Sequence, residues 1–161
     1  MIVEDGTGKS DAESYVSLAD ANAYHEVHGN SSWAALSDEA KEAALRYATR
    51  WLDGKYRWRG AVLNGEQALG WPREDATDDE GRTLEGVPNR VKAAANEMAL
   101  AHVEQPVNET VGARVVREKV DVIEVQYADQ SGNEGQRYPI VDALLRGLAR
   151  RTGAFVELKR A

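Results

Sequence analysis

A chain of 161 residues with 42% apolar side chains is long enough to bury the core of one globular domain. No apolar run approaches the ~20 residues that a membrane-spanning helix needs, so we expect no membrane partner. The chain has no cysteine, which excludes disulfides, thiolate metal ligands and cysteine nucleophiles. Its formal charge is −7, and residues 1–40 alone carry one lysine against eight acidic side chains. A protein with this balance can hold phosphates only through a local basic patch.

Residues 1–16 are expected to form an extended N-terminal arm, because turn-forming glycines occur there and no helical period begins before Leu18. Residues 6–10, GTGKS, resemble the end of a phosphate-binding P-loop. That motif needs a further glycine where Val3 stands, and a buried strand ahead of it, for which there is almost no chain. We therefore interpret residues 6–10 as a solvated turn.

Four helices are predicted from apolar side chains that recur at helical spacing between capping and stopping residues. They are expected to run from Ser17 to Gly29, from Ser37 to Gly54, from Val87 to Pro106 and from Pro139 to Gly153. Trp33, in the loop between the first two, should fold back on the core. The predicted fold class is mainly α: a small bundle of about four helices with an inserted β-ribbon, long loops and extended termini.

The β-ribbon is predicted from valines and isoleucine that alternate with charged residues between 113 and 128. The alternation slips near Asp121, so either a bulge lies there or two short strands are joined by a tight turn. We expect one domain over residues 1–161. Its parts are the arm (1–16), a helical core (17–106) with a loop (54–86), the ribbon and a loop (113–138), the C-terminal helix (139–153) and a tail (154–161).

Arginines alternate with aromatic side chains around the end of the second predicted helix. The densest basic cluster consists of Arg46, Arg50, Arg57, Trp58 and Arg59. Such a pattern can stack the bases and hold the phosphates of single-stranded nucleic acid. Alternatively, Trp58 and Trp71 anchor the loop over the helical core, with arginine stems packed along them. This packing interpretation is the preferred one.

No arrangement typical of catalysis or of metal binding is evident. His25 and His28 are three residues apart, whereas the zincin motif needs four. A loop that contains Asp75, Asp78, Asp79 and Glu80 does not have the spacing of a calcium loop. Nucleophile elbows and dinucleotide fingerprints are missing. We expect no enzyme, no cofactor and no bound metal, while an enzyme built from scattered acidic residues stays an open alternative.

Several short segments, spread over most of the chain, resemble a family of small proteins of tailed bacteriophages. The most specific is Gln67-Ala68-Leu69-Gly70-Trp71-Pro72-Arg73. The others are 4–8, 14–17, 21–24, Trp33, 41–45, 51–53, 56–60, 87–88 and 118–120. Sequences of this kind are often named DnaT-like single-stranded-DNA-binding proteins. Their size and helical fold also resemble the head-tail adaptors, or connectors, which form a ring under the capsid portal.

These two resemblances imply opposite surface charges, since a ring around a DNA channel should be acidic and a strand-binding protein basic. Because the chain is acidic overall, we expect a structural virion protein. It would be a homo-oligomeric adaptor ring, of twelve copies as in connectors. It would be made in the host cytoplasm and located in the virion neck. Its partners would be the portal, a tail-side neck or stopper protein, and genomic DNA passing through the channel.

Within that adaptor prediction, portal docking is assigned to the apolar C-terminal end of the chain, through Leu148, Phe155, Val156, Leu158 and Arg160. The acidic loop with Asp75, Asp78, Asp79 and Glu80 would face the channel. The alternative function is a replication accessory protein that binds single-stranded DNA through the basic cluster at residues 46–59.

Overall fold

The computed structural model describes residues 1–104, 117–120, 123–126 and 138–151. These residues form a mainly α fold, as the sequence predicts, with three small two-stranded sheets. The helices are α1 (Leu18–Val27), α2 (Ser31–Ala34), α3 (Asp38–Lys55), α4 (Asn89–Glu104) and α5 (Pro139–Leu144). The strands are β1 (Tyr56–Trp58), β2 (Ala61–Val62), β3 (Arg73–Glu74), β4 (Arg117–Val120), β5 (Ile123–Gln126) and β6 (Ala149–Arg151). Within this described part, no helix is both long and apolar enough to cross a membrane.

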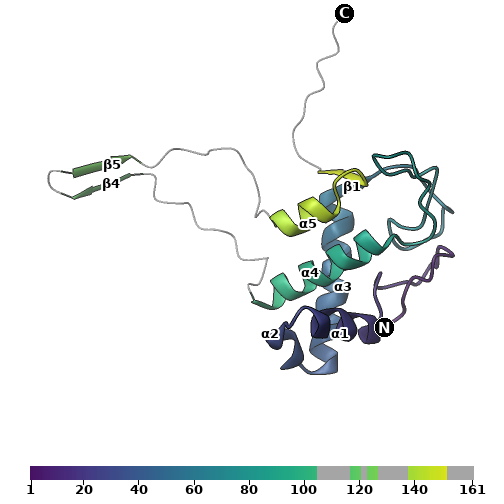
Figure 1. The fold of residues 1–161 in the computed structure, drawn as a ribbon, viewed down its shortest axis with the longest axis horizontal. Helices are drawn as coiled ribbons and strands as arrows, with labels where there is room; N and C mark the ends of the chain where they lie inside the picture. Colours follow the sequence, from purple (N-terminus) through teal and green to yellow (C-terminus); the bar gives the residue numbers. More distant parts are fainter. Residues whose placement is uncertain (105–116, 121–122, 127–137, 152–161) are drawn as a thin grey trace, which may run out of the picture.

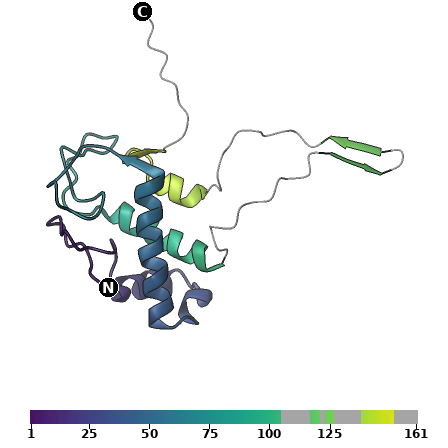
Figure 2. The same cartoon turned by 180° about the vertical axis from the view of Figure 1, so that it is seen from behind.

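The long helix α3 runs through the whole helical body and packs along α4 (Figures 1 and 2). Helices α1 and α2 lie at its N-terminal end, whereas β1 and α5 lie at its C-terminal end. The serine caps predicted for α1 and α3 are confirmed, because Ser17 Oγ accepts from the Asp20 amide and Ser37 Oγ from the Ala40 amide. Small side chains such as Ala48, Ala94 and Ala95 are fully buried and allow α3 and α4 to approach closely.

The N-terminal segment is not an extended arm but folds back on the core. Val3 forms a parallel bridge with Ser14, and the Glu4 amide donates to the Ser14 carbonyl at 2.9 Å. Tyr15 and Val16, which follow, are buried. The arm prediction was wrong because burial of these apolar side chains holds the segment against the core. The turn formers in residues 5–8 belong to a packed loop.

Three parts of the chain meet at the carboxylate of Asp53, near the end of α3. Its Oδ1 accepts from the Tyr15 hydroxyl and from Trp58 Nε1 at 2.8 Å, and its Oδ2 accepts from the Gly70 amide at 2.9 Å. A Cβ on Gly70 would lie 2.5 Å from Trp58 Nε1, so only glycine permits this approach. Burial, and then the Asp53 charge, raise the pKa of Tyr15 well above its usual value, so its hydroxyl remains a donor.

The last predicted helix is too long, because α5 ends at Leu144 and the chain then turns back. Gly147 has φ of 81°, a left-handed conformation that favours glycine. The chain after it forms β6, which pairs antiparallel with β1. Leu145 and Leu148 are buried, one before and one after Gly147. Their apolar spacing predicted a continuous helix, but both side chains reach the core through the turn between α5 and β6.

The predicted β-ribbon is present as two short strands rather than as a bulged one. Strand β4 pairs antiparallel with β5, and Val120 lies opposite Ile123. Residues 113–116, 121–122 and 127–137 of the predicted ribbon and loop, and the tail at 154–161, lie outside the described residues. The Trp33 prediction is confirmed, since this side chain is buried, although it lies on the short helix α2 rather than in a loop.

Replacing Asp53 by alanine should lower the free energy of unfolding by about 3 kcal/mol, because it leaves three donors without their charged acceptor. Urea unfolding of purified protein would measure this loss. The matched control is Asp11→Ala, which removes an exposed carboxylate and should change stability little. Equal stability of the Asp53 and Asp11 variants would contradict the role given to Asp53.

Candidate nucleic-acid interface

Two arginines lie directly opposite each other on the exposed side of the ribbon formed by β1 and β6. In the register of this sheet Arg57 is the partner of Arg150, and both side chains are exposed. Opposite residues of an antiparallel pair project to the same side, with Cβ atoms roughly 5 Å apart. Neither guanidinium is in an ion pair with any described residue. Like charges placed in this way repel each other.

Two further exposed arginines lie on the segments that adjoin the ribbon, and we define the cationic face as Arg57, Arg59, Arg146 and Arg150. The Arg59 amide donates to the Leu148 carbonyl at 3.0 Å, which continues the pairing of the two chain segments beyond β1. Its guanidinium contacts Asp79 at 3.1 Å. Arg146 lies in the turn that follows α5 and is exposed.

A row of aromatic rings lies beneath the ribbon and fixes its position. The row consists of Trp71, Trp58, Tyr56, Trp51 and Tyr138, whose neighbouring ring centroids are 5.3–6.1 Å apart. Trp71 is fully buried, whereas Trp58, Trp51 and Tyr138 are half-buried. The packing interpretation of Trp58 and Trp71 is thus confirmed: alternation along β1 turns Tyr56 and Trp58 inward and Arg57 outward.

The structure separates the basic cluster that the sequence grouped together. Arg46, in the middle of α3, is held by Glu13 at 3.2 Å and by Glu42 at 3.1 Å. Arg50 is exposed on α3, and only Arg57 and Arg59 belong to the cationic face. Arg150 was not among the predicted site residues, because the sequence pattern placed it in the last helix rather than in β6. The run Ala149-Arg150-Arg151 beyond a glycine was the available signal for a short strand.

The acidic loop is largely occupied by contacts within the chain. Asp78 accepts from the Arg82 amide at 2.9 Å and from Arg82 Nε at 2.7 Å, and these bonds hold the pKa of its carboxyl below the usual value. Glu80 also contacts Arg82, and Asp79 contacts Arg59. Asp75 is exposed, with φ of 55°. In the described part of the chain, no three His, Asp or Glu side chains are grouped as a metal site would require.

The P-loop-like residues do surround an anion, but the anion belongs to the chain itself. Glu4 is 2% exposed, and its carboxylate accepts from the amides of Gly6, Gly8 and Lys9 at 2.8–2.9 Å. These amides form the kind of nest that binds phosphate in other proteins. Because Glu4 fills it, the nest stabilises the N-terminal loop, and the interpretation as a solvated turn needs this correction.

A family model described as "Putative DnaT-like ssDNA binding protein" matches residues 1–161. The chain therefore belongs to this family. Neither the curated proteins nor the solved structures gave a match.

Membership of this family overturns the head-tail adaptor prediction, because nothing in the match indicates a portal-bound ring. Four further predictions depended on the adaptor prediction and are therefore also wrong. They are the virion location, the twelve-copy ring, the portal and tail-side partners, and the passage of genomic DNA. The error came from using the net charge of −7 as a measure of the surface that meets DNA. The acids of Glu4, Asp53 and Asp78 are held in internal contacts, and the cationic face lies elsewhere.

The residues assigned to portal docking and to the channel lose those roles with the adaptor prediction. Leu148 is 1% exposed and packs in the core beside β6, so it offers no docking surface. Phe155, Val156, Leu158 and Arg160 lie outside the described residues.

Replacing Arg57 by glutamine should raise the stability of the protein by a few tenths of a kcal/mol, because it removes the repulsion of Arg150. Thermal unfolding at low salt would show the gain as a higher melting temperature. The gain should vanish in 1 M salt, where the screening length is about 3 Å. Lower stability of Arg57→Gln at both salt concentrations would show that Arg57 has a stabilising partner instead.

Proposed function

We propose that the protein binds single-stranded DNA, without catalysis, on the cationic face. The observation that carries the proposal is the Arg57–Arg150 pair, two exposed guanidinium groups in register across one ribbon. Membership of a family described as binding single-stranded DNA supports the same ligand. The phosphates of a strand would supply the negative charge that no described residue places between these two arginines.

The position of the arginines on a strand supports a phosphate-binding role. Both guanidinium groups extend from paired backbone, and the aromatic row holds that backbone against the core. Arginine presents a planar set of donors that fits phosphate oxygens with two parallel hydrogen bonds. Attachment to a rigid ribbon reduces the conformational entropy that the side chains lose on binding.

The charge distribution allows this interface in a protein that is acidic overall. Residues 1–40 carry the same net charge as the whole chain, and the two acidic side chains of α1 lie at the opposite end of α3 from the ribbon (Figure 1). Interactions between exposed charges are largely screened beyond about 8–10 Å at physiological salt. The charges on α1 therefore weaken binding at the cationic face only slightly.

The double variant Arg57→Gln/Arg150→Gln should bind a fluorescent oligothymidine about tenfold or more weakly at low salt, as measured by anisotropy. It should also show a shallower dependence on salt. Each phosphate contact on a single strand contributes about 0.7 to the slope of log affinity against log salt, so losing two reduces the slope by about 1.4.

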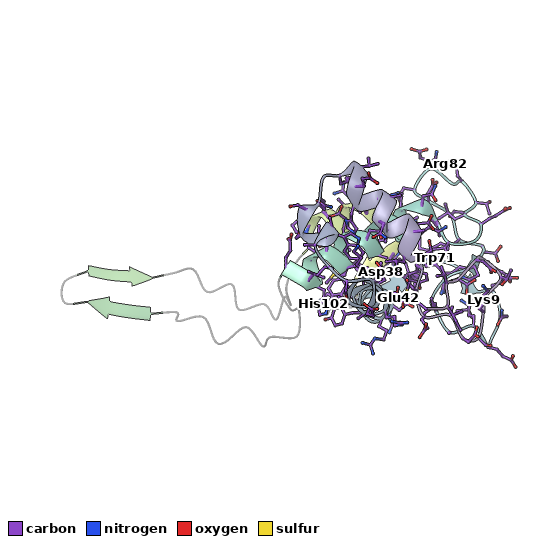
Figure 3. The ribbon with its side chains drawn as sticks, turned by 90° about the horizontal axis from the view of Figure 1, so that it is seen from below. Lys9, Asp38, Glu42, Trp71, Arg82 and His102 are labelled. Atoms are coloured by element: carbon purple, nitrogen blue, oxygen red, sulfur yellow. The ribbon has the colours of Figure 1, made fainter. Side chains whose placement is uncertain are left out.

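The matched control is Lys9→Gln/Arg82→Gln (Figure 3), which removes the same formal charge from two side chains that are already paired with acids, Lys9 with Asp5 and Arg82 with Asp78. This control should keep the affinity and most of the salt slope. Equal losses in the two double variants would show that only net charge matters. The absence of binding by the unaltered protein at low salt would refute the proposed function.

A further inference from the structure

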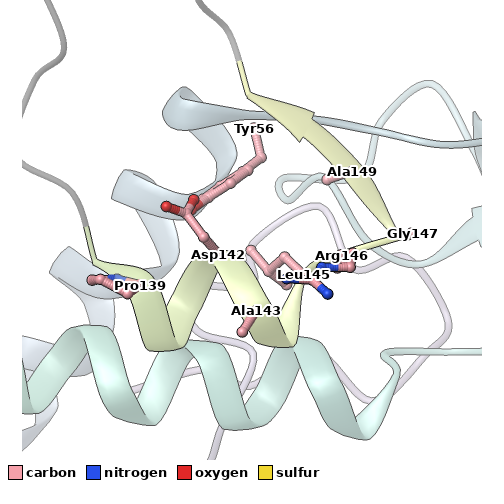
Figure 4. Close-up of a pocket in the computed structure, with 8 residues that line it drawn as sticks. All are labelled: Tyr56, Pro139, Asp142, Ala143, Leu145, Arg146, Gly147 and Ala149. Carbon is pink, nitrogen blue, oxygen red and sulfur yellow. The ribbon is translucent and has the colours of Figure 1, made fainter.

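A pocket of about 490 Å³ lies in the angle between α5 and the β1–β6 ribbon (Figure 4). At one end Tyr56 and Asp142 point toward each other, and the Tyr56 hydroxyl donates to Asp142 Oδ1 at 2.6 Å. At the other end lie Arg146 and Gly147, where the chain reverses into β6. The remaining lining residues are Pro139, Ala143, Leu145 and Ala149.

The size and walls of this pocket suit one flat heteroaromatic ring. Small-molecule sites in proteins usually measure about 300–1,000 Å³ and combine apolar walls with a few polar groups. Here Leu145, Ala149 and the Tyr56 ring supply apolar wall, and Asp142 supplies a polar end. A nucleobase has the matching character, with apolar faces and a hydrogen-bonding edge.

The charges at the rim suit a phosphate beside that ring. Arg146 is exposed at the mouth, and no described residue forms an ion pair with it. Arg90 donates to the carbonyls of Ala143 and Arg146 at 3.3 and 2.9 Å, which offsets the negative end of α5. The carboxylate of Asp79, beside Gly147, is already paired with Arg59. At this end of the pocket Arg146 is therefore available to an anion, whereas the Asp142 carboxylate lies at the other end.

We propose that this pocket accepts one nucleotide of a bound single strand, with the base inside and its phosphate on Arg146. The inference rests on the proposed function and adds to it a reason for strand selectivity. A base in a duplex is paired and stacked, and turning it outward costs a few kcal/mol. An unpaired base enters without that cost. The arginines of the cationic face would bind the phosphates of a single strand and of a duplex alike.

The test fills the pocket with an indole ring by the substitution Ala143→Trp. Ala143 lines the pocket and is exposed, so the larger side chain does not displace the core. Base stacking on protein surfaces contributes ~1–3 kcal/mol per base, so single-strand affinity should fall about tenfold. Affinity for a duplex of the same sequence should stay unchanged. The control is Ala40→Trp, an exposed site on α3 far along the chain, and circular dichroism should confirm that both variants are folded.

A backbone-only oligonucleotide, which lacks all bases, separates a lost base contact from a general disturbance. The unaltered protein should bind it about tenfold more weakly than the normal strand, whereas Ala143→Trp should bind both alike. If the unaltered protein binds single strands and Ala143→Trp binds them equally well, the pocket inference alone is overturned. It is overturned too if single-strand and duplex affinity fall together. If the unaltered protein binds no strand, the proposed function itself fails.

Discussion

The structure depends on one carboxylate, that of Asp53, where α3 gives way to β1. Its hydrogen bonds join the segment after the N-terminal loop, through Tyr15, to the Trp58 side chain and to the backbone at Gly70. Three stretches, at residues 15, 58 and 70, are thereby fixed at the same end of the helix. The direction in which β1 leaves α3, and so the position of Arg57 on the ribbon, follows from this point.

The net charge of the chain does not describe the surface that it offers to a ligand. Many acidic side chains are used as acceptors inside the fold: Glu4 for the amides of its own loop, Asp53 for the aromatic row, and Asp78 for Arg82. Arginines are divided in a similar way, since Arg46 is paired with acids whereas Arg57 and Arg150 are left facing solvent. Function is therefore better judged from charges that the described fold leaves unpaired than from their sum.

The helical part of the fold could be predicted from the sequence, because caps and apolar spacing are local signals. Ser17 and Ser37 marked the starts of α1 and α3, and the inward packing of Trp58 followed from its neighbours. The β1–β6 pairing could not be predicted, since it joins Arg57 to Arg150 across more than half of the chain and each strand has only three residues. For that reason Arg146 and Arg150, two of the four arginines of the cationic face, were not predicted as site residues. The nest around Glu4 could not be predicted, because a P-loop-like run indicates a bound phosphate and not a carboxylate of the same chain.

A cross-linking experiment tests the account most directly. A single-stranded oligonucleotide carrying photoreactive halogenated uracils would be irradiated with the protein, and the modified peptides identified by mass spectrometry. The account predicts cross-links within residues 56–59 and 139–150, the two segments that build the ribbon and the pocket. Cross-links confined to residues 1–40, or to the α3 surface around Arg46, would contradict it.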